Sequence, residues 1–391
     1  MQAKADQRYD YTLMAPGPVT LHPKVREILA QPMIHHRTPE FDQILAQALK
    51  RLKVVFQTQE PVYLITSTGS GGMESLIVNT LSPGDRILAI NSGKFGERWA
   101  EMCRAYGLLV DEIKVPWGEA VTLTSLNDKL SAQSYKAVIT QACETSTGVM
   151  NPIQKMGELL VTYPKTLFLV DAITALGAVP MPMDEWHIDG LIGGSQKAFM
   201  LPTGMSFVCF SKKAQAEFSN SKIPKFYFDI KKEMAANAKG ETFFSSNVTL
   251  VKALNFVLAE VEKRGLENLF KTIQRRADFI EIILQLLDLK SFAKVKSASL
   301  TAIALPAGID GQKLRENLET NFNITVMGGQ DQAKGKIIRV GHMGYLQDTD
   351  LLHFSVAFYR SLQQLNFTPA IDFEKYQSNL SQWLAQNSES V

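Results

Sequence analysis

At residues 189–198 the chain reads Asp-Gly-Leu-Ile-Gly-Gly-Ser-Gln-Lys-Ala. The apolar pair Leu191 and Ile192 predicts a buried strand, and the two glycines after it let the backbone bend sharply and let a bulky group come close. Lys197 follows on this turn. A lysine in a dry, cationic site can lose its proton and attack a carbonyl to form a Schiff base. Most lysines lie on solvated loops, so this interpretation of Lys197 depends on the rest of the chain.

The same pattern, a short apolar run next to a helical segment, recurs on both sides of this stretch. Alternating strands and helices indicate an α/β fold with a largely parallel sheet and helices on both of its faces. The last two runs are joined too briefly for a helical crossover, so one strand is expected to be antiparallel. The seven predicted strands are Tyr63–Thr66, Arg86–Asn91, Val110–Val115, Ala137–Gln141, Thr166–Val170, Gly190–Gly193 and Ser206–Phe210.

The chain of 391 residues is longer than one hydrophobic core usually accommodates, so two domains are expected. We predict an N-terminal arm at 1–20, a large domain at 21–255 and a smaller C-terminal α/β domain at 256–391. The proline-punctuated arm is expected either to be disordered or to lie across a surface near a partner or a site. In the small domain we expect strands at Ser299–Leu305, Ile324–Val326 and Lys336–Val340, with helices at Gly311–Thr320 and Thr349–Leu365.

The composition excludes several classes of protein. The net charge of +2 gives no bias towards nucleic acid or a membrane surface, and no apolar run is long enough to span a bilayer. The N-terminus lacks the apolar region of a signal peptide, and the three cysteines are far apart. Together with six histidines in no zinc pattern, these features predict a cytoplasmic protein without a structural metal.

A phosphate-binding turn is predicted after the first strand, where the chain reads Thr66-Ser-Thr-Gly-Ser-Gly-Gly72 before an expected helix at Met73–Leu81. A glycine-rich turn that leads into a helix exposes unpaired N–H groups at the positive end of the helix dipole. A phosphate fits such a turn, although a turn that merely caps the helix is the commoner explanation.

Further polar groups follow other predicted strands, and each also has a structural explanation. Asp171 ends one strand and is either a helix cap or an acid for a ring nitrogen. Thr145 follows another, Phe95 could lie flat over a planar ligand, and Arg339 offers a fork that matches a carboxylate. A phosphate site, a ring stacker, an acid, a hydroxyl, a lysine and a carboxylate clamp together are the parts that hold pyridoxal phosphate and an amino acid.

The order of these motifs resembles the class V aminotransferases of pyridoxal-phosphate fold type I. Ser195-Gln-Lys197 and Arg339-Val-Gly-His-Met-Gly344 are its specific motifs, and the resemblance runs from about residue 14 to 365. The chain is most similar to the alanine–glyoxylate and serine–pyruvate aminotransferase group. It is also similar to a cyanobacterial branch labelled soluble hydrogenase small subunit.

The resemblance implies a role for each site residue. Lys197 would form the Schiff base with the cofactor, Asp171 would pair with the ring nitrogen, and Arg339 would bind the substrate carboxylate. In these enzymes the neighbouring subunit of a homodimer usually completes the phosphate-binding site. Ser245 falls at the segment that matches this contribution. The remaining cofactor contacts implied are Gly69, Ser70, Gly71 and Gln196 at the phosphate, Phe95 stacked on the ring and Thr145 at the phenolic oxygen.

The resemblance implies ping-pong transamination between a small amino acid, alanine or serine, and a 2-oxo acid, glyoxylate or pyruvate. Arg37 is a possible second cation, and with it a dicarboxylic substrate would become possible. Two alternatives remain. A cysteine desulfurase needs a reactive cysteine on a mobile loop, and a non-catalytic subunit of a redox complex needs none of the catalytic residues.

Overall fold

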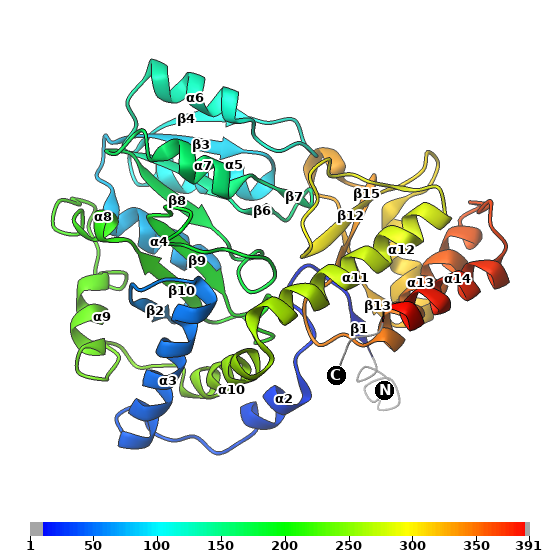
Figure 1. The fold of residues 1–391 in the computed structure, drawn as a ribbon, viewed down its shortest axis with the longest axis horizontal. Helices are drawn as coiled ribbons and strands as arrows, with labels where there is room; N and C mark the ends of the chain where they lie inside the picture. The colour runs from blue at the N-terminus through cyan, green and yellow to red at the C-terminus, as the bar shows by residue number, and fades with distance from the viewer. Residues whose placement is uncertain (1–10, 388–391) are drawn as a thin grey trace.

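The computed structural model describes residues 11–387, and its largest element is a seven-stranded sheet (Figure 1). All seven predicted strands are present, and the antiparallel one is β10, which pairs with β9 on one side and β2 on the other. The other six are therefore parallel to one another, with their carboxyl ends at one edge. In sheet order they are β2 (Val62–Ile65), β10 (Ser206–Phe210), β9 (Gly190–Gly194), β8 (Leu167–Asp171), β5 (Ala137–Gln141), β3 (Arg86–Asn91) and β4 (Leu109–Lys114).

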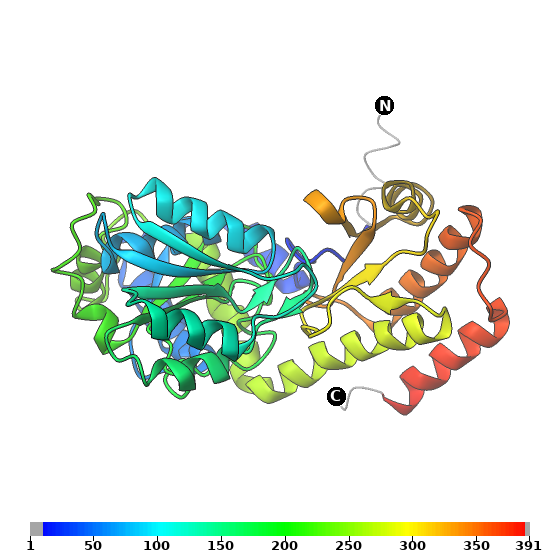
Figure 2. The same ribbon diagram turned by 90° about the horizontal axis from the view of Figure 1, so that it is seen from above.

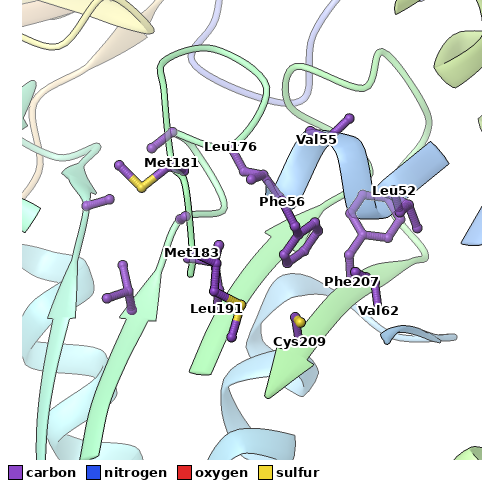
Figure 3. Close-up of a cluster of buried hydrophobic side chains, with 14 of the residues drawn as sticks. Leu52, Val55, Phe56, Val62, Leu176, Met181, Met183, Leu191, Phe207 and Cys209 are labelled. Atoms are coloured by element: carbon purple, nitrogen blue, oxygen red, sulfur yellow. The ribbon is translucent and has the colours of Figure 1, made fainter. Parts of the chain in front are cut away.

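Successive side chains of these strands enter different hydrophobic clusters because they point to opposite faces of the sheet. Leu191 and Phe207 pack on the face covered by α3 (Pro39–Phe56), α7 (Ile153–Leu160) and α10 (Val248–Arg264). Ile192 and Val208 pack on the face covered by α4 (Gly69–Thr80) and α5 (Lys94–Ala105). Figure 3 shows side chains of α3, Phe56 among them, against the first of these faces. The sheet is thus a rigid platform buried on both sides.

A second core lies in the C-terminal part of the chain, around a sheet of order β11-β12-β15-β14. The long helix α11 (Leu266–Leu286) runs from the larger unit along this smaller one (Figure 2). The remaining elements of this part are β11 (Lys290–Ser291), β12 (Leu300–Ala304), α12 (Gly311–Phe322), β14 (Met327–Gly328), β15 (Ile337–Gly341), α13 (Asp348–Gln364) and α14 (Phe373–Gln386).

The structure corrects two details of the sequence analysis. Helix α4 begins at Gly69 and not at Met73, so the glycine-rich turn is itself the first turn of the helix. The strand predicted at Ile324–Val326 is shorter, β13 (Ile324–Thr325), and pairs in parallel with β1 (Thr12–Leu13) of the arm. A two-residue strand has too little pattern to reveal its partner, because that partner lies about 310 positions away in the chain.

The proposed domain boundary at 255/256 falls inside α10, whose Val257 and Leu258 still pack in the larger core. The helical segment breaks instead at Gly265, between α10 and α11. The first ten residues of the predicted arm and the last four of the chain lie outside the described residues, and the division into domains stays a prediction.

Short elements complete residues 11–387, and among these residues no helix is both long and apolar enough to cross a bilayer. They are α2 (Pro23–Leu29), α6 (Leu123–Ala132), β6 (Cys143–Glu144), β7 (Val149–Met150), α8 (Lys212–Gln215), α9 (Ile230–Asn237) and a 3-10 turn at Asp331–Ala333.

His342 closes the end of the smaller sheet. Its side chain is fully buried, and Nδ1 donates a hydrogen bond to the carbonyl of Ala298 at 2.8 Å. Nε2 has no partner among the described residues. Burial lowers the pKa of His342 from 6.5 to about 4, so the folded protein keeps this ring neutral.

We expect His342 to make the protein less stable as the pH falls from about 6.5 to 4. In that range the unfolded chain binds a proton that the folded chain excludes, at a cost of up to roughly 3 kcal/mol. Urea unfolding at pH 7 and pH 5 checks this: the drop in stability should shrink in His342→Gln. An equal drop in both proteins would contradict it. His187→Gln is the control, since that histidine is exposed.

Candidate active site

A tight loop after β9 presents Lys197, and Ser195 holds this loop together. The Ser195 hydroxyl donates to the Pro202 carbonyl at 2.7 Å and accepts from the Met205 N–H at 3.3 Å. The Leu201 N–H donates to the Ser195 carbonyl at 3.0 Å. These bonds close the loop on itself, so its geometry fixes where the lysine points.

The Lys197 side chain is buried, and Nζ donates to the backbone carbonyl of Pro16 at 2.7 Å. No ion pair links it to a described carboxylate. Burial lowers its pKa to about 8; Cys143 and Asp171 oppose this shift, and the positive charge of Arg339 adds to it. Roughly a quarter of this amine is therefore neutral near pH 7.5, far more than for an ordinary lysine, and the neutral form is the one that a nucleophile or base requires.

Asp171, the last residue of β8, is buried beside this lysine. Its Oδ1 accepts the N–H of Ile173 at 2.9 Å. Burial raises the pKa of Asp171 to about 7, with Glu144 adding to the shift and Lys197 opposing it. A positively charged group placed against this carboxyl would stabilise its ionised form, because the attraction would offset the cost of burying the negative charge.

The start of α4 has the features of an anion site. The N–H groups of Gly69 and Ser70, its first two residues, have no acceptor within residues 11–387. A Cβ at Gly69 would lie 2.4 Å from Ile173 Cδ1, and one at Gly71 would lie 2.6 Å from Ser67. Gln196 adds a buried Oε1 without a hydrogen-bond partner. Only glycines allow the backbone to come this close to its neighbours. The N–H groups of the first turn are left without an acceptor and can donate to an anion.

Glu144 connects two of the predicted site segments. Its buried carboxylate accepts the N–H groups of Phe95 and Gly96, at 3.2 Å and 3.0 Å, and the hydroxyl of Ser146 at 2.6 Å. The positive end of the α5 dipole also stabilises a carboxylate placed at the first turn of this helix. Glu144 therefore fixes Phe95 relative to Thr145. The guanidinium of Arg98 lies 5.0 Å from the centre of the Phe95 ring.

Arg339 reaches this group from β15 of the smaller unit. Nε donates to the Gly328 carbonyl at 2.9 Å, and Nη1 donates to the Thr145 carbonyl at 3.0 Å. Within residues 11–387 Nη2 has no partner. Burial lowers the pKa of Arg339 to about 10, and it remains charged at neutral pH. The Thr145 hydroxyl meets that of Thr174 at 2.8 Å.

Eight of the predicted residues thus lie at one edge of the sheet, on segments that follow β2, β3, β6, β8 and β9, with Arg339 added from β15. Ser245 is different: it is exposed and makes none of the hydrogen bonds above. It lines a pocket with Thr66, Tyr227 and Phe228. Arg37 makes none of the hydrogen bonds of this group either. Its guanidinium pairs with Glu241 at 3.0 Å.

The arm was expected either to be disordered or to lie across a surface near a partner or a site, and Pro16 and Gly17, which the sequence analysis did not name, lie against Lys197. The sequence analysis also missed the anchoring role of Glu144, although Glu144 lies in a quoted motif. An acid directly after a buried strand was the available signal, since isolated buried acids are rare. Among residues 11–387, no group of three or more His, Cys, Asp or Glu side chains is arranged to hold a metal ion.

Residues 24–366 match the family described as Aminotransferase class-V. The soluble hydrogenase small subunit of Synechococcus sp. (strain PCC 6716) is 38% identical over 91% of this chain and 95% of its own. The L-aspartate–glyoxylate aminotransferase of Paracoccus denitrificans is 35% identical over 86% and 87%. The crystal structure of an alanine–glyoxylate aminotransferase from Nostoc sp. matches with a TM-score of 0.86 at 29% identity, covering 90% of this chain and 95% of that one.

Proposed function

Because this chain belongs to the class-V aminotransferases, we propose that it moves the amino group of alanine or serine to glyoxylate or pyruvate in a ping-pong reaction. The observation that carries the proposal is the buried amine of Lys197, on which the buried carboxyl of Asp171 and the buried guanidinium of Arg339 both act electrostatically. The three groups supply a nucleophile, a partner for a ring nitrogen and a clamp for a carboxylate.

The family implies pyridoxal phosphate as cofactor, and the residues of the site fit it. The free N–H groups of Gly69 and Ser70 match a phosphate that accepts hydrogen bonds, and the unpaired Oε1 of Gln196 could accept only from a phosphate oxygen that carries a proton. Glu144 fixes the backbone of Phe95, the residue proposed to stack on the ring. When bound, the cofactor supplies a carbonyl that reacts with amines and a ring that accepts the electron pair of a broken Cα–H bond.

Each protein group then has one task. Asp171 holds the proton at the ring nitrogen, which lowers the carboxyl's own burial cost. Lys197, once free, takes the α-proton of the amino acid on Nζ and returns it to a neighbouring carbon. Burial around Nζ excludes water that would compete for this proton.

The positively charged residues near the site favour a short amino acid, with a single carboxylate, as the amino donor. Arg339 is the one predicted site arginine, and its Nη2 has no partner within residues 11–387. Arg37, the possible second cation, is already paired with Glu241. The names of the Nostoc and Paracoccus relatives both include glyoxylate, which supports it as acceptor, and the Paracoccus name makes aspartate the donor to compare.

We infer a homodimer in which Ser245 completes the phosphate contact of the partner subunit's site. Its neighbours form an exposed aromatic surface: Phe226 is 69% exposed, and Tyr227 and Phe243 are also exposed. Apolar side chains gathered in this way usually mark an interface. The surface adjoins the phosphate site through Phe228, whose ring would lie 3.2 Å from a Cβ at Gly71.

Neither alternative function gains support. A desulfurase needs an exposed thiolate, whereas Cys103, Cys143 and Cys209 are buried and burial raises the pKa of Cys143 to about 12. A non-catalytic subunit, the reading suggested by the name of the Synechococcus relative, would have no need for the amine, carboxyl and anion site described above.

We expect the purified protein with pyridoxal phosphate to show a visible absorbance band that bleaches when alanine or serine is added. Lys197→Ala should lack the wild-type band, because it removes the amine proposed to form the Schiff base. Lys213→Ala, which removes a lysine at the far end of the sheet, is the control. A protein that stays colourless with added cofactor would overturn the aminotransferase proposal in favour of the non-catalytic subunit.

The two arginines should affect different substrates. Arg339→Lys removes the planar fork and should lower kcat/KM for alanine and serine by roughly 100-fold, the value of a charged hydrogen-bond pair. Arg37→Gln should leave these values unchanged. Rates with alanine, serine and aspartate as donors and glyoxylate as acceptor check this. A loss confined to aspartate in Arg37→Gln would instead identify a dicarboxylate enzyme.

The mass in solution should be twice the chain mass of 43.5 kDa. Phe226→Asp combined with Phe243→Asp should shift it towards a single chain, because two charges would be buried in the interface. Sedimentation equilibrium measures both. Val161→Asp, at another exposed apolar residue, is the control. A dimer that persists in the double variant would mean that a different surface forms the interface.

A further inference from the structure

The segment Met14–Val19, here called the strap, passes directly over Lys197. Pro16 offers its carbonyl to Nζ at 2.7 Å. A Cβ at Gly17 would lie 2.5 Å from both Nζ and Cδ and 2.7 Å from Cε. Met14, Ala15 and Pro16 are buried. The strap is thus in contact with most of the length of the lysine side chain.

The strap is fixed on the side of the smaller unit. Its preceding strand β1 pairs with β13, and the Met14 N–H donates to the Thr325 carbonyl at 3.0 Å. The Gly341 N–H donates to the Met14 carbonyl at 2.7 Å. Met14 itself is fully buried in the core of the smaller unit.

The other end of the strap is fixed beside the lysine. Val19 packs in a small cluster with Ala198, the residue after Lys197, and with Met343. The Tyr345 N–H donates to the Thr20 carbonyl at 3.0 Å, and the Thr20 hydroxyl donates back to the Leu13 carbonyl at 3.2 Å. A loop tied at both ends cannot drift, so the Pro16 carbonyl is a preorganised acceptor.

We propose that the strap positions Lys197, with the Pro16 carbonyl as the acceptor that holds Nζ whenever this amine is free. A carbonyl can accept an N–H from the neutral amine or from the ammonium ion, and it adds no full negative charge. It therefore orients the amine without forcing it to stay protonated, as a carboxylate would. The strap also keeps water from the amine. The proposal rests on the proposed role of Lys197 in catalysis.

The charged and titratable groups that act on Lys197 come from other segments. They are Cys143, Arg339 and Asp171, and residues 14–19 contain none. Changes in the strap therefore alter the burial of Nζ and its acceptor while leaving these groups in place. Since burial is the main cause that lowers the pKa of Lys197 to about 8, a displaced strap should raise it towards 10.5.

The first test measures the reactivity of Lys197 in cofactor-free protein. Acetic anhydride acylates only the neutral amine, so the pH dependence of labelling, followed by peptide mass spectrometry, reports the pKa of Lys197. We expect a midpoint near 8 in the wild type. Gly17→Ala forces the strap and the end of the Lys197 side chain apart, and Thr20→Val removes only the hydroxyl bond to Leu13. Both should raise the midpoint by about half a pH unit or more.

Gly308→Ala is the matched control. Gly308 also has a positive φ, +89°, but a Cβ there would meet no atom within 4 Å. Gly308→Ala therefore also places a side chain on a positive-φ backbone, without touching the site, so its midpoint should equal that of the wild type. Thr20→Val guards against misfolding of Gly17→Ala, since no new atom is placed against Lys197.

The second test uses the reciprocal effect. In Lys197→Met the donor to Pro16 is lost while most of the volume is kept, so hydrogen–deuterium exchange across residues 11–20 should become about threefold faster or more. Lys213→Met removes a lysine that donates to the Thr166 carbonyl at 2.6 Å and should leave this exchange unchanged. Unchanged midpoints in both strap variants, or unchanged exchange in Lys197→Met, would overturn the proposal.

Neither test depends on turnover. If the strap variants shift the labelling midpoint as expected but the wild type never transfers an amino group, the proposed function is refuted while the contact between the strap and Lys197 is supported. A working aminotransferase with unshifted midpoints would refute the strap alone.

Discussion

The buried amine of Lys197 is the feature on which the rest of the site depends. An ammonium ion in this position would lose its hydration, and no carboxylate forms an ion pair with it within the described residues. The protein holds it with a single carbonyl, that of Pro16, and places the charge of Arg339 in the same region. Burial and the charge of Arg339 favour the neutral amine, which is the form that attacks carbonyls and accepts protons, whereas the Pro16 carbonyl can hold either form.

This arrangement needs two units of structure. Lys197 and Asp171 are on loops of the large sheet, whereas Arg339 and the anchors of the strap belong to the smaller unit. Arg339 bridges the two directly through the Thr145 carbonyl. The glycines of the motif at 341–344 have a structural reason as well: a Cβ at Gly341 would lie 2.2 Å from the Ala15 carbonyl oxygen. The motif thus makes room for the strap and also carries the clamp.

The buried carboxylate of Glu144 has a different task. It receives four hydrogen-bond donors, the N–H groups of Phe95, Gly96 and Ser146 and the Ser146 hydroxyl. Such a carboxylate is satisfied without a cation, and in return it locks the start of α5 to the segment that carries Thr145. Supports of this kind fix Phe95, the proposed ring-stacking residue, before any ligand binds.

Most of the fold was predictable because the seven buried strands are short apolar runs separated by helical segments, a pattern that is local in the chain. The positions of Lys197, Asp171 and the glycine-rich turn were predictable for a related reason: polar or glycine residues at or directly after the end of a strand lie at its carboxyl end. Arg339 lies within β15, and its place in the site was expected from the resemblance of its motif. The sequence by itself therefore determined the sheet and the edge at which most of the predicted site residues lie together. Only the tertiary structure decided that Pro16 accepts from Lys197, that β1 pairs with β13 and that Arg37 is neutralised by Glu241. Each of these contacts joins segments some 180 to 310 residues apart, and no periodicity within one segment records which distant segment will lie against it.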